Sequence, residues 1–231
     1  MKTIVWKAVC CVMFASWMVS RAGAVSIPFT EDFASSNANW KDSASLNLGF
    51  VGSGGPDGGS YVYANQVFAR QPVSMGLILF RGQDFFDSSN DAFLGNWITG
   101  SVGKLTAYVR QNTSQPLSFF ARFATSNNFP GVDVELPTVV QPNTWTKLIF
   151  DISPTNPLLT PEGGPGTYEA TFGSLGNVQI GVGDLSSFAS DATSYTFDLD
   201  KVSIGAPEPA SFVLLAIGVI GGGLLWRGRQ G

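Results

Sequence analysis

The stretch Tyr195-Thr-Phe-Asp-Leu-Asp-Lys-Val-Ser-Ile204 indicates the fold most directly, because apolar and polar residues alternate along it. Successive side chains of an extended strand point to opposite faces, so every second residue shares a face. One face collects Tyr195, Phe197 and Leu199. The alternation resumes with Val202 and Ile204 after a shift of one residue near Asp200. We therefore predict a long half-buried strand with a β-bulge at Asp200.

Four further segments alternate in the same way, at residues 104–111, 118–124, 144–152 and 177–182. Turns rich in Gly, Pro, Asn and Ser separate them, and the region between them shows no 3.6-residue apolar period of helical length. Short strands joined by such turns are typical of an all-β antiparallel sandwich. We expect one β-sandwich domain, a jelly roll, over residues 25–205.

Three connections interrupt this pattern. Residues 52–60 lack apolar side chains, and they lack the Lys-Ser/Thr pair and following helix of a phosphate-binding loop. Residues 153–166 are rich in Pro and Gly, and we expect no strand within them. The third connection carries Asp84, Asp87, Asn90 and Asp91, but it lacks the glycine and terminal glutamate of a helix-loop-helix calcium loop. It is the weaker of two candidate calcium sites.

The first 24 residues have the three regions of a secretory signal peptide. Lys2 and Lys7 form a basic start, residues 8–19 are apolar, and residues 22–24 are small enough for signal peptidase. A retained N-terminal anchor is the alternative. Both cysteines of the chain, Cys10 and Cys11, lie in this segment. Cleavage after residue 24 would leave a mature domain without disulfides, thiol nucleophiles or thiolate metal sites.

The composition excludes further classes of catalytic site and of partner. The chain has no histidine, which removes the Ser-His-Asp and Cys-His nucleophile systems. Residues 25–205 hold eight Lys and Arg residues against 16 of the 17 Asp and Glu residues, a formal charge of about −8. That sign disfavours nucleic acid as a partner. An acidic domain suits a soluble extracellular protein or one that holds divalent cations.

The last 26 residues have three parts: the triplet Pro207-Glu208-Pro209, an apolar run at about residues 210–226, and the basic residues Arg227 and Arg229. A helix of about 17 residues is ~25 Å long, which is marginal but adequate for a bilayer core of ~30 Å. The basic end orients it with residues 25–205 outside the cytoplasm. We expect a transmembrane helix, and a plain membrane anchor is the simpler alternative.

This tail resembles the PEP-CTERM sorting signal of exported bacterial proteins. The resemblance rests on Pro207, Glu208, Pro209, the apolar run and the basic residues Arg227 and Arg229. It implies three partners: the export machinery, signal peptidase and an exosortase, a membrane enzyme that processes such tails. It also implies anchoring in the membrane before processing, followed by delivery to the cell surface or the extracellular matrix.

The region between the two ends is similar to galactose-binding-like jelly rolls, a fold that carbohydrate-binding modules share. The similarity lies in residues 30–33 (Thr-Glu-Asp-Phe), residues 145–151 (Trp-Thr-Lys-Leu-Ile-Phe-Asp) and residues 196–204. Residues 93–97 (Phe-Leu-Gly-Asn-Trp) are also similar to the laminin B domain, a relative of the jelly rolls. These patterns imply the fold and no particular ligand.

In many such jelly rolls a structural calcium ion ties the first strand to the last. The resemblance places Glu31 and Asp32 at the start, and Asp198 and Asp200 at the end, in matching positions. Carboxylates from distant strands, together with backbone carbonyls, supply the six to eight oxygens that Ca²⁺ takes. The alternative is that these are solvated charges that keep strand edges from pairing.

Three functions remain open. The leading hypothesis is a non-enzymatic structural or adhesive protein of the surface or matrix. The second is a carbohydrate-binding module for extracellular polysaccharide, whose aromatic platform would come from Trp40, Trp97, Trp145, Tyr61, Tyr63 or Tyr108. The third is a small glycosidase that uses two carboxylates. Exposed coplanar aromatics on a concave sheet would favour the second, and a buried carboxylate pair in a cleft would favour the third.

Overall fold

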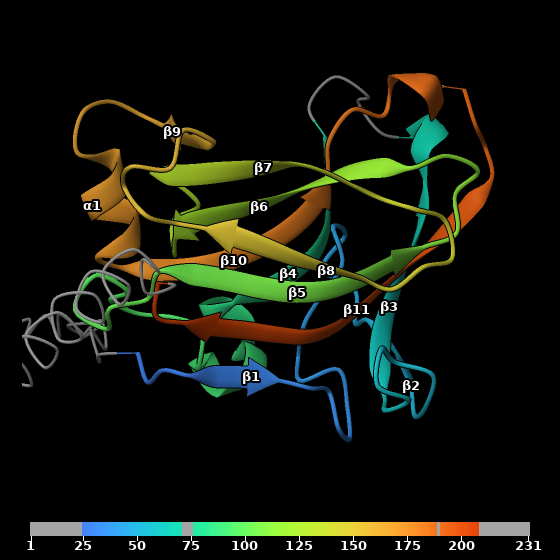
Figure 1. Cartoon of the computed structure of the whole chain (residues 1–231), viewed down its shortest axis with the longest axis horizontal. Helices are drawn as coiled ribbons and strands as arrows, with labels where there is room; N and C mark the ends of the chain where they lie inside the picture. Colours follow the sequence, from blue (N-terminus) through green and yellow to red (C-terminus); the bar gives the residue numbers. More distant parts are fainter. Residues whose placement is uncertain (1–24, 71–75, 189, 208–231) are drawn as a thin grey trace, which may run out of the picture.

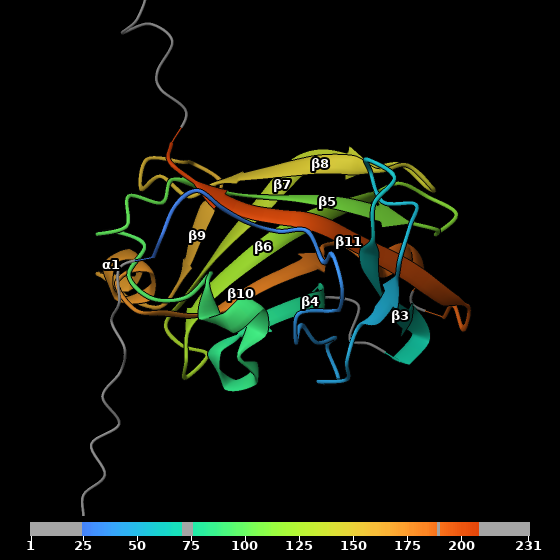
Figure 2. The same cartoon turned by 90° about the horizontal axis from the view of Figure 1, so that it is seen from below.

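Residues 25–70, 76–188 and 190–207 are described by a computed structural model, and they form two antiparallel sheets. Figures 1 and 2 show the sheets as two layers, with β5, β8 and β11 in one and β4, β6 and β10 in the other. The prediction of an all-β sandwich is therefore confirmed. Neither the jelly-roll connection nor the exact domain limits are tested, and both stay predictions.

The first sheet is built around β11 (Ser194–Gly205). Its order is β2-β3-β11-β5-β8, and β1 pairs with β11 beyond the end of β3. The other strands are β1 (Phe29–Glu31), β2 (Gly49–Val51), β3 (Tyr61–Val67), β5 (Lys104–Gln111) and β8 (Thr146–Asp151). The register with β5 shifts between Asp200 and Ser203, and Lys201 has a φ of 48°. The predicted bulge at Asp200 is therefore present.

The second sheet has the order β4-β10-β6-β7-β9. Its strands are β4 (Leu77–Gln83), β6 (Leu117–Thr125), β7 (Gly131–Val140), β9 (Leu159–Glu162) and β10 (Leu175–Val182). One short α-helix, α1 (Thr167–Phe172), precedes β10. The 3-10 turns are η1 (Phe68–Arg70), η2 (Asp84–Phe86), η3 (Ser88–Asp91) and η4 (Ser186–Phe188).

The core lies between the two sheets, and the side chains that fill it are those on the apolar face that the alternation predicts. Four of the predicted segments coincide with β5, β6, β8 and β10 to within about two residues. Their inward side chains are at most 1% exposed: Leu105, Ala107, Val109, Phe119, Ala121, Phe123, Leu148, Phe150, Val178, Ile180 and Val182. Trp40 and Trp97 are also in the core, at 0% and 1% exposure. Burying this apolar surface is the main favourable term in folding.

The expectation that no strand lies in residues 153–166 is wrong, because β9 forms there. The strand is only four residues long, contains Pro161 and pairs with β7 alone. Proline lacks the N–H that a central strand needs, so it is confined to edge strands such as this one. Without alternation or length, the sequence carried no signal for it.

The described residues include no helix that is long and apolar enough to cross a membrane. The predicted signal peptide at residues 1–24 and the predicted transmembrane helix at about 210–226 both lie outside the described residues.

Candidate functional site

A row of polar side chains crosses the outer face of the second sheet. Strand register places Arg81 of β4 opposite Gln179 of β10, Gln179 opposite Arg122 of β6, and Arg122 opposite Asp133 of β7. The adjacent residues on these strands face inward and are buried, so this row faces away from the core. Four strands from distant parts of the sequence thus bring two cations, an amide and a carboxyl group together.

A hollow of about 480 Å³ opens over this row. Glu162 of β9 and Asn128, from the turn between β6 and β7, add polar groups to its lining. Its apolar lining comes from Gly76, Leu77, Ile78, Phe120 and Phe129. Sites for small molecules combine an apolar wall with a few placed polar groups in this way.

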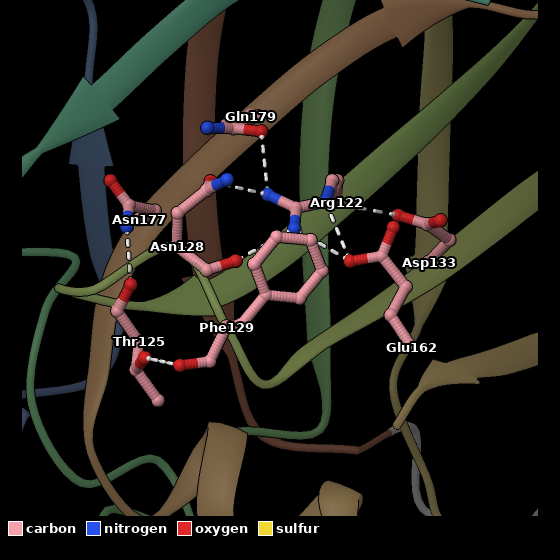
Figure 3. A network of polar contacts seen from close by, with 8 residues as sticks. All are labelled: Arg122, Thr125, Asn128, Phe129, Asp133, Glu162, Asn177 and Gln179. Atoms are coloured by element: carbon pink, nitrogen blue, oxygen red, sulfur yellow. Dashed lines mark hydrogen bonds and ion pairs between the residues drawn. The ribbon is translucent and has the colours of Figure 1, made fainter. Parts of the chain in front are cut away.

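Arg122 is the centre of the polar network (Figure 3). Its Nη2 and Nε donate to Oε2 of Glu162 at 2.6 and 2.8 Å. Its Nη1 donates to Oδ1 of Asn128 at 2.8 Å and to Oε1 of Gln179 at 3.2 Å. The side chain is only 10% exposed. Nη2 also donates to the backbone carbonyl of Asn128 at 2.8 Å, so all five N–H groups have partners and the guanidinium is fixed in one orientation at the floor of the hollow.

Asp133 and Glu162 form a carboxyl pair on one side of Arg122. The Oδ1 atom of Asp133 is 3.9 Å from Nε of Arg122 and accepts no hydrogen bond among the described residues. Burial raises the pKa of Asp133 to about 7, repulsion from Glu162 adds to this, and attraction from Arg122 opposes it. Both carboxyls thus lie beside the same guanidinium. Asp133 therefore holds its proton to a higher pH than an exposed aspartate does.

This pair is a carboxylate pair in a cleft, the feature that would favour a glycosidase. However, glycosidases hold their two carboxyls about 5–9.5 Å apart so that a sugar carbon or a water fits between them. Here Oε2 of Glu162 accepts two hydrogen bonds from Arg122, and Oδ1 of Asp133 is 3.9 Å from Nε of the same residue, so both carboxyls are turned to a protein cation rather than to a substrate. The geometry therefore fits a binding surface better than a hydrolytic centre.

We expect the Asp133 carboxyl to make wild-type stability fall as the pH rises. Its pKa is raised from 3.8 to about 7 on folding, so the folded protein binds the proton more tightly than the unfolded chain. Stability therefore declines between about pH 4 and pH 7. Asp133→Asn removes this decline, so its advantage in Tm over the wild type should grow across that interval and level off above it. Thermal unfolding of both proteins from pH 4 to pH 8 checks this; parallel Tm curves would contradict it.

Phe129 stands at the rim of the hollow and is 60% exposed. Its ring centroid lies 5.2 Å from the Arg122 guanidinium carbon, a cation–π contact that holds one side of the ring (Figure 3). Its backbone carbonyl accepts a hydrogen bond from Oγ1 of Thr125 at 2.6 Å. An exposed aromatic side chain, held on one face by Arg122, therefore lies beside the polar row.

The proposed calcium residues lie along β1 and β11 but do not form one cluster. Asp198 is 7% exposed, and its Oδ2 accepts a hydrogen bond from Nε of Arg110 at 2.7 Å. Oε1 of Glu31 accepts from the backbone N–H of Phe33 at 2.9 Å. Asp198 and Glu31 are thus each engaged with a partner inside the protein.

Asp200 and Asp32 come nearer to the predicted calcium site, because their carboxyl groups lie close enough to repel each other. Asp200 is 1% exposed, and burial raises its pKa to about 6, with repulsion from Asp57 and Asp32 adding to the effect and Lys201 opposing it. Nζ of Lys201 is 2.7 Å from Oδ2 of Asp57. A lysine therefore supplies positive charge within this group. Among the described residues, no set of three or more acidic, His or Cys side chains is arranged to hold a metal. A calcium ion here stays a prediction.

The acidic loop is also folded differently from a calcium loop. Residues 84–91 form the two turns η2 and η3, with Asp87 between them at a φ of 53°. Asp84 accepts hydrogen bonds from Ser126 and from the backbone N–H of Phe85. Its oxygens therefore have partners in its own turn and in the turn that follows β6.

Of the six candidate sugar-binding aromatics, two lie in the core and four are half-buried. Trp40 and Trp97 belong to the core. Trp145 is half-buried, and the guanidinium carbon of Arg110 lies 4.7 Å from its ring centroid, on one face of the ring. The remaining three are half-buried on the first sheet: Tyr61, Tyr63 and Tyr108.

Sequence reasoning missed the residues that form the hollow. Arg122, Asp133 and Glu162 come from three strands whose register cannot be read from one sequence. The predicted sugar-binding aromatics are Trp and Tyr residues only, so Phe129 is not among them. One usable signal existed: Arg122 interrupts an otherwise apolar strand, Leu117–Thr125, where a charged residue needs a partner.

One family model matches the chain, over residues 206–230, which include the triplet Pro207-Glu208-Pro209. This segment is a PEP-CTERM protein-sorting motif. The PEP-CTERM motif indicates an exported protein that an exosortase, a membrane enzyme, processes. The expected sorting signal is therefore confirmed. A search of curated proteins finds no match to the chain.

Several solved structures superpose on this chain. An exo-β-agarase superposes with a TM-score of 0.50 at 10% identity, covering 79% of this chain and 26% of that one. The L4b domain of human laminin α-2 gives 0.48 at 11% identity, covering 80% and 100%. Clostridium thermocellum xylanase 10B, with CBM22-1 and GH10 modules complexed with xylohexaose, gives 0.46 at 14% identity, covering 78% and 28%. This chain thus spans about a quarter of the length of the two enzymes. At such low identity, the likeness concerns the fold alone.

Proposed function

We propose that this exported protein is a non-catalytic β-sandwich that binds extracellular polysaccharide through the hollow on its second sheet. The observation that carries the proposal is the pairing of an exposed aromatic, Phe129, with a row of fixed polar groups beneath it. A sugar ring has an apolar C–H face and a rim of hydroxyl groups. It matches a wall that is aromatic on one side and lined with donors and acceptors on the other.

The sorting motif supports the same role. A PEP-CTERM tail belongs to an exported protein, and polysaccharide is abundant at the surface and in the matrix outside bacteria. In this proposal, residues 1–24 direct export and are removed. Residues 210–226 hold the protein in the membrane until an exosortase processes the tail. The polysaccharide-binding sandwich then acts as an adhesive or structural component of the matrix.

A glycan array tests the proposal, using the full-length protein in a detergent without a sugar headgroup. We expect saturable binding to a defined class of glycan, and titration calorimetry then gives the Kd. Binding to none of the glycans would contradict the proposed function.

We expect Phe129→Ala to weaken glycan binding at least tenfold, about 1.4 kcal/mol, because it removes the stacking surface. Phe129 is largely exposed, so the substitution should leave Tm nearly unchanged. Phe50→Ala is the matched control, since Phe50 is 42% exposed but lies on β2 of the other sheet. Titration of each variant with the best array ligand provides the comparison. Equal Kd values for Phe129→Ala and the wild type would place the ligand elsewhere.

A further inference from the structure

Arg81 differs from Arg122 in how its charge is balanced. It is half-buried on β4 and lines the hollow. Its Nη1 donates to Oγ of Ser45 at 3.2 Å. The Gln83 amide, with its oxygen turned toward Arg81, accepts from Nη2 at 3.0 Å and from Nε at 3.3 Å. Both partners are neutral, and no described carboxylate forms an ion pair with Arg81.

Arg122 is the cation that acts on Arg81, and Lys41 is its backbone partner. Lys41 pairs with Arg81 through two backbone hydrogen bonds, Arg81 N to Lys41 O at 2.8 Å and Lys41 N to Arg81 O at 3.1 Å. Nζ of Lys41 binds the Asn47 side chain and lies 5.4 Å from the ring centroid of Phe86, so it too has neutral partners. Burial lowers the pKa of Arg81, attraction from Asp42 opposes this, and repulsion from Arg122 adds to it. Arg81 nevertheless stays charged at neutral pH.

Asp42 does not neutralise Arg81 through direct contact. Its Oδ1 accepts hydrogen bonds from the backbone N–H groups of Ala44 and Leu46, at 2.9 and 2.8 Å. Across the row, Glu162 is bound to Arg122, and Asp133 lies beyond Arg122 on β7. The Arg81 side of the hollow is therefore an electropositive place in a domain whose formal charge is about −8.

A half-buried guanidinium with neutral partners is poised to receive an anion, because the fork of an arginine matches a carboxylate through two parallel hydrogen bonds. We propose that the polysaccharide is acidic and that Arg81 binds the carboxylate of a uronic acid residue. This rests on the proposed function, which it narrows to one class of glycan. In this arrangement Phe129 stacks on a sugar ring, Arg122 holds Phe129 in place, and Arg81 selects the charged residue.

The sharpest test compares uronic acid oligomers with their methyl esters, which keep the sugar and remove the charge. The probes are oligomers of galacturonate, glucuronate, mannuronate and guluronate, titrated into the full-length protein. We expect at least one acid oligomer to bind ten times or more tightly than its ester. Arg81→Gln should abolish that difference by weakening the acid form alone, and Arg81→Lys should retain part of it.

Lys147→Gln is the control, because it removes one positive charge from the exposed face of β8, on the other sheet. It should bind the acid oligomer like the wild type. Thermal unfolding of each variant shows that the comparison is between folded proteins.

Three results would overturn the inference. Equal binding of acid and ester by the wild type would remove the role of charge while leaving the proposed function standing. A preference for the acid that persists in Arg81→Gln would assign it to another residue. Tighter binding of a sulfated galactan than of any uronate, lost in Arg81→Gln, would mean that Arg81 selects sulfate. Absence of binding to every acidic and neutral glycan would instead contradict the proposed function itself.

Discussion

Arg122→Met is expected to lower the free energy of unfolding by about 3 kcal/mol and to abolish glycan binding. The substitution removes the guanidinium that donates two hydrogen bonds to Glu162 and lies 3.9 Å from Asp133. Loss of one partner from a buried ion pair costs about 3–5 kcal/mol, since the remaining charge stays buried and unpaired. The lower end applies because the side chains of Asp133 and Glu162 are 31% and 28% exposed. Urea unfolding of the variant measures the change.

A double-variant cycle separates the lost ion pair from lost packing. Arg122→Met combined with Glu162→Gln removes both charges, so the loss should be smaller than for Arg122→Met alone. A simple sum of the two single losses would mean that the pair is not coupled. That result would contradict the central position given to Arg122.

Replacing Pro207, Glu208 and Pro209 by alanine is expected to stop delivery of the protein to the matrix. The motif match covers these residues, and an exosortase must recognise the tail before it can process it. The variant should stay in the membrane fraction with its tail attached. Immunoblotting of membrane and extracellular fractions, with mass spectrometry of the C-terminus, measures this.

Ser211→Ala, two residues beyond the triplet, is the control and should be sorted normally. Equal extracellular amounts of the triplet variant and the wild type would contradict the role of the motif. Retention of both variants would indicate a general effect of any change near the tail.

The fold was predictable where one face of a strand is buried and the other is solvated. β5, β8 and β11 alternate cleanly, and the bulge at Asp200 left a one-residue shift in the pattern. β9 was not predictable, because a four-residue edge strand with a proline has no alternation to detect. Alternation in a sequence reflects the burial of one face of a strand. A strand without a buried face therefore cannot be predicted from it.

The binding surface was less predictable than the fold. Arg81, Gln179, Arg122 and Asp133 become neighbours only through the strand order β4-β10-β6-β7. Nothing in a single sequence specifies that order. Trp40 and Trp97 are buried in the core and Trp145 is half-buried, whereas Phe129 is 60% exposed in a turn where no periodic pattern applies. In contrast, the sorting motif could be recognised from the sequence because its three parts are contiguous.

Side-chain footprinting by hydroxyl radicals, with and without a saturating glycan, tests the central claim most directly. The full-length protein and its best array ligand are used, and oxidation is measured at single aromatic residues. We predict that bound glycan protects Phe129, which is 60% exposed in the free protein, and leaves Phe50 on the other sheet unchanged. Unchanged oxidation of Phe129, with protection of Trp145 and Tyr61, would place the ligand on the first sheet and contradict the account.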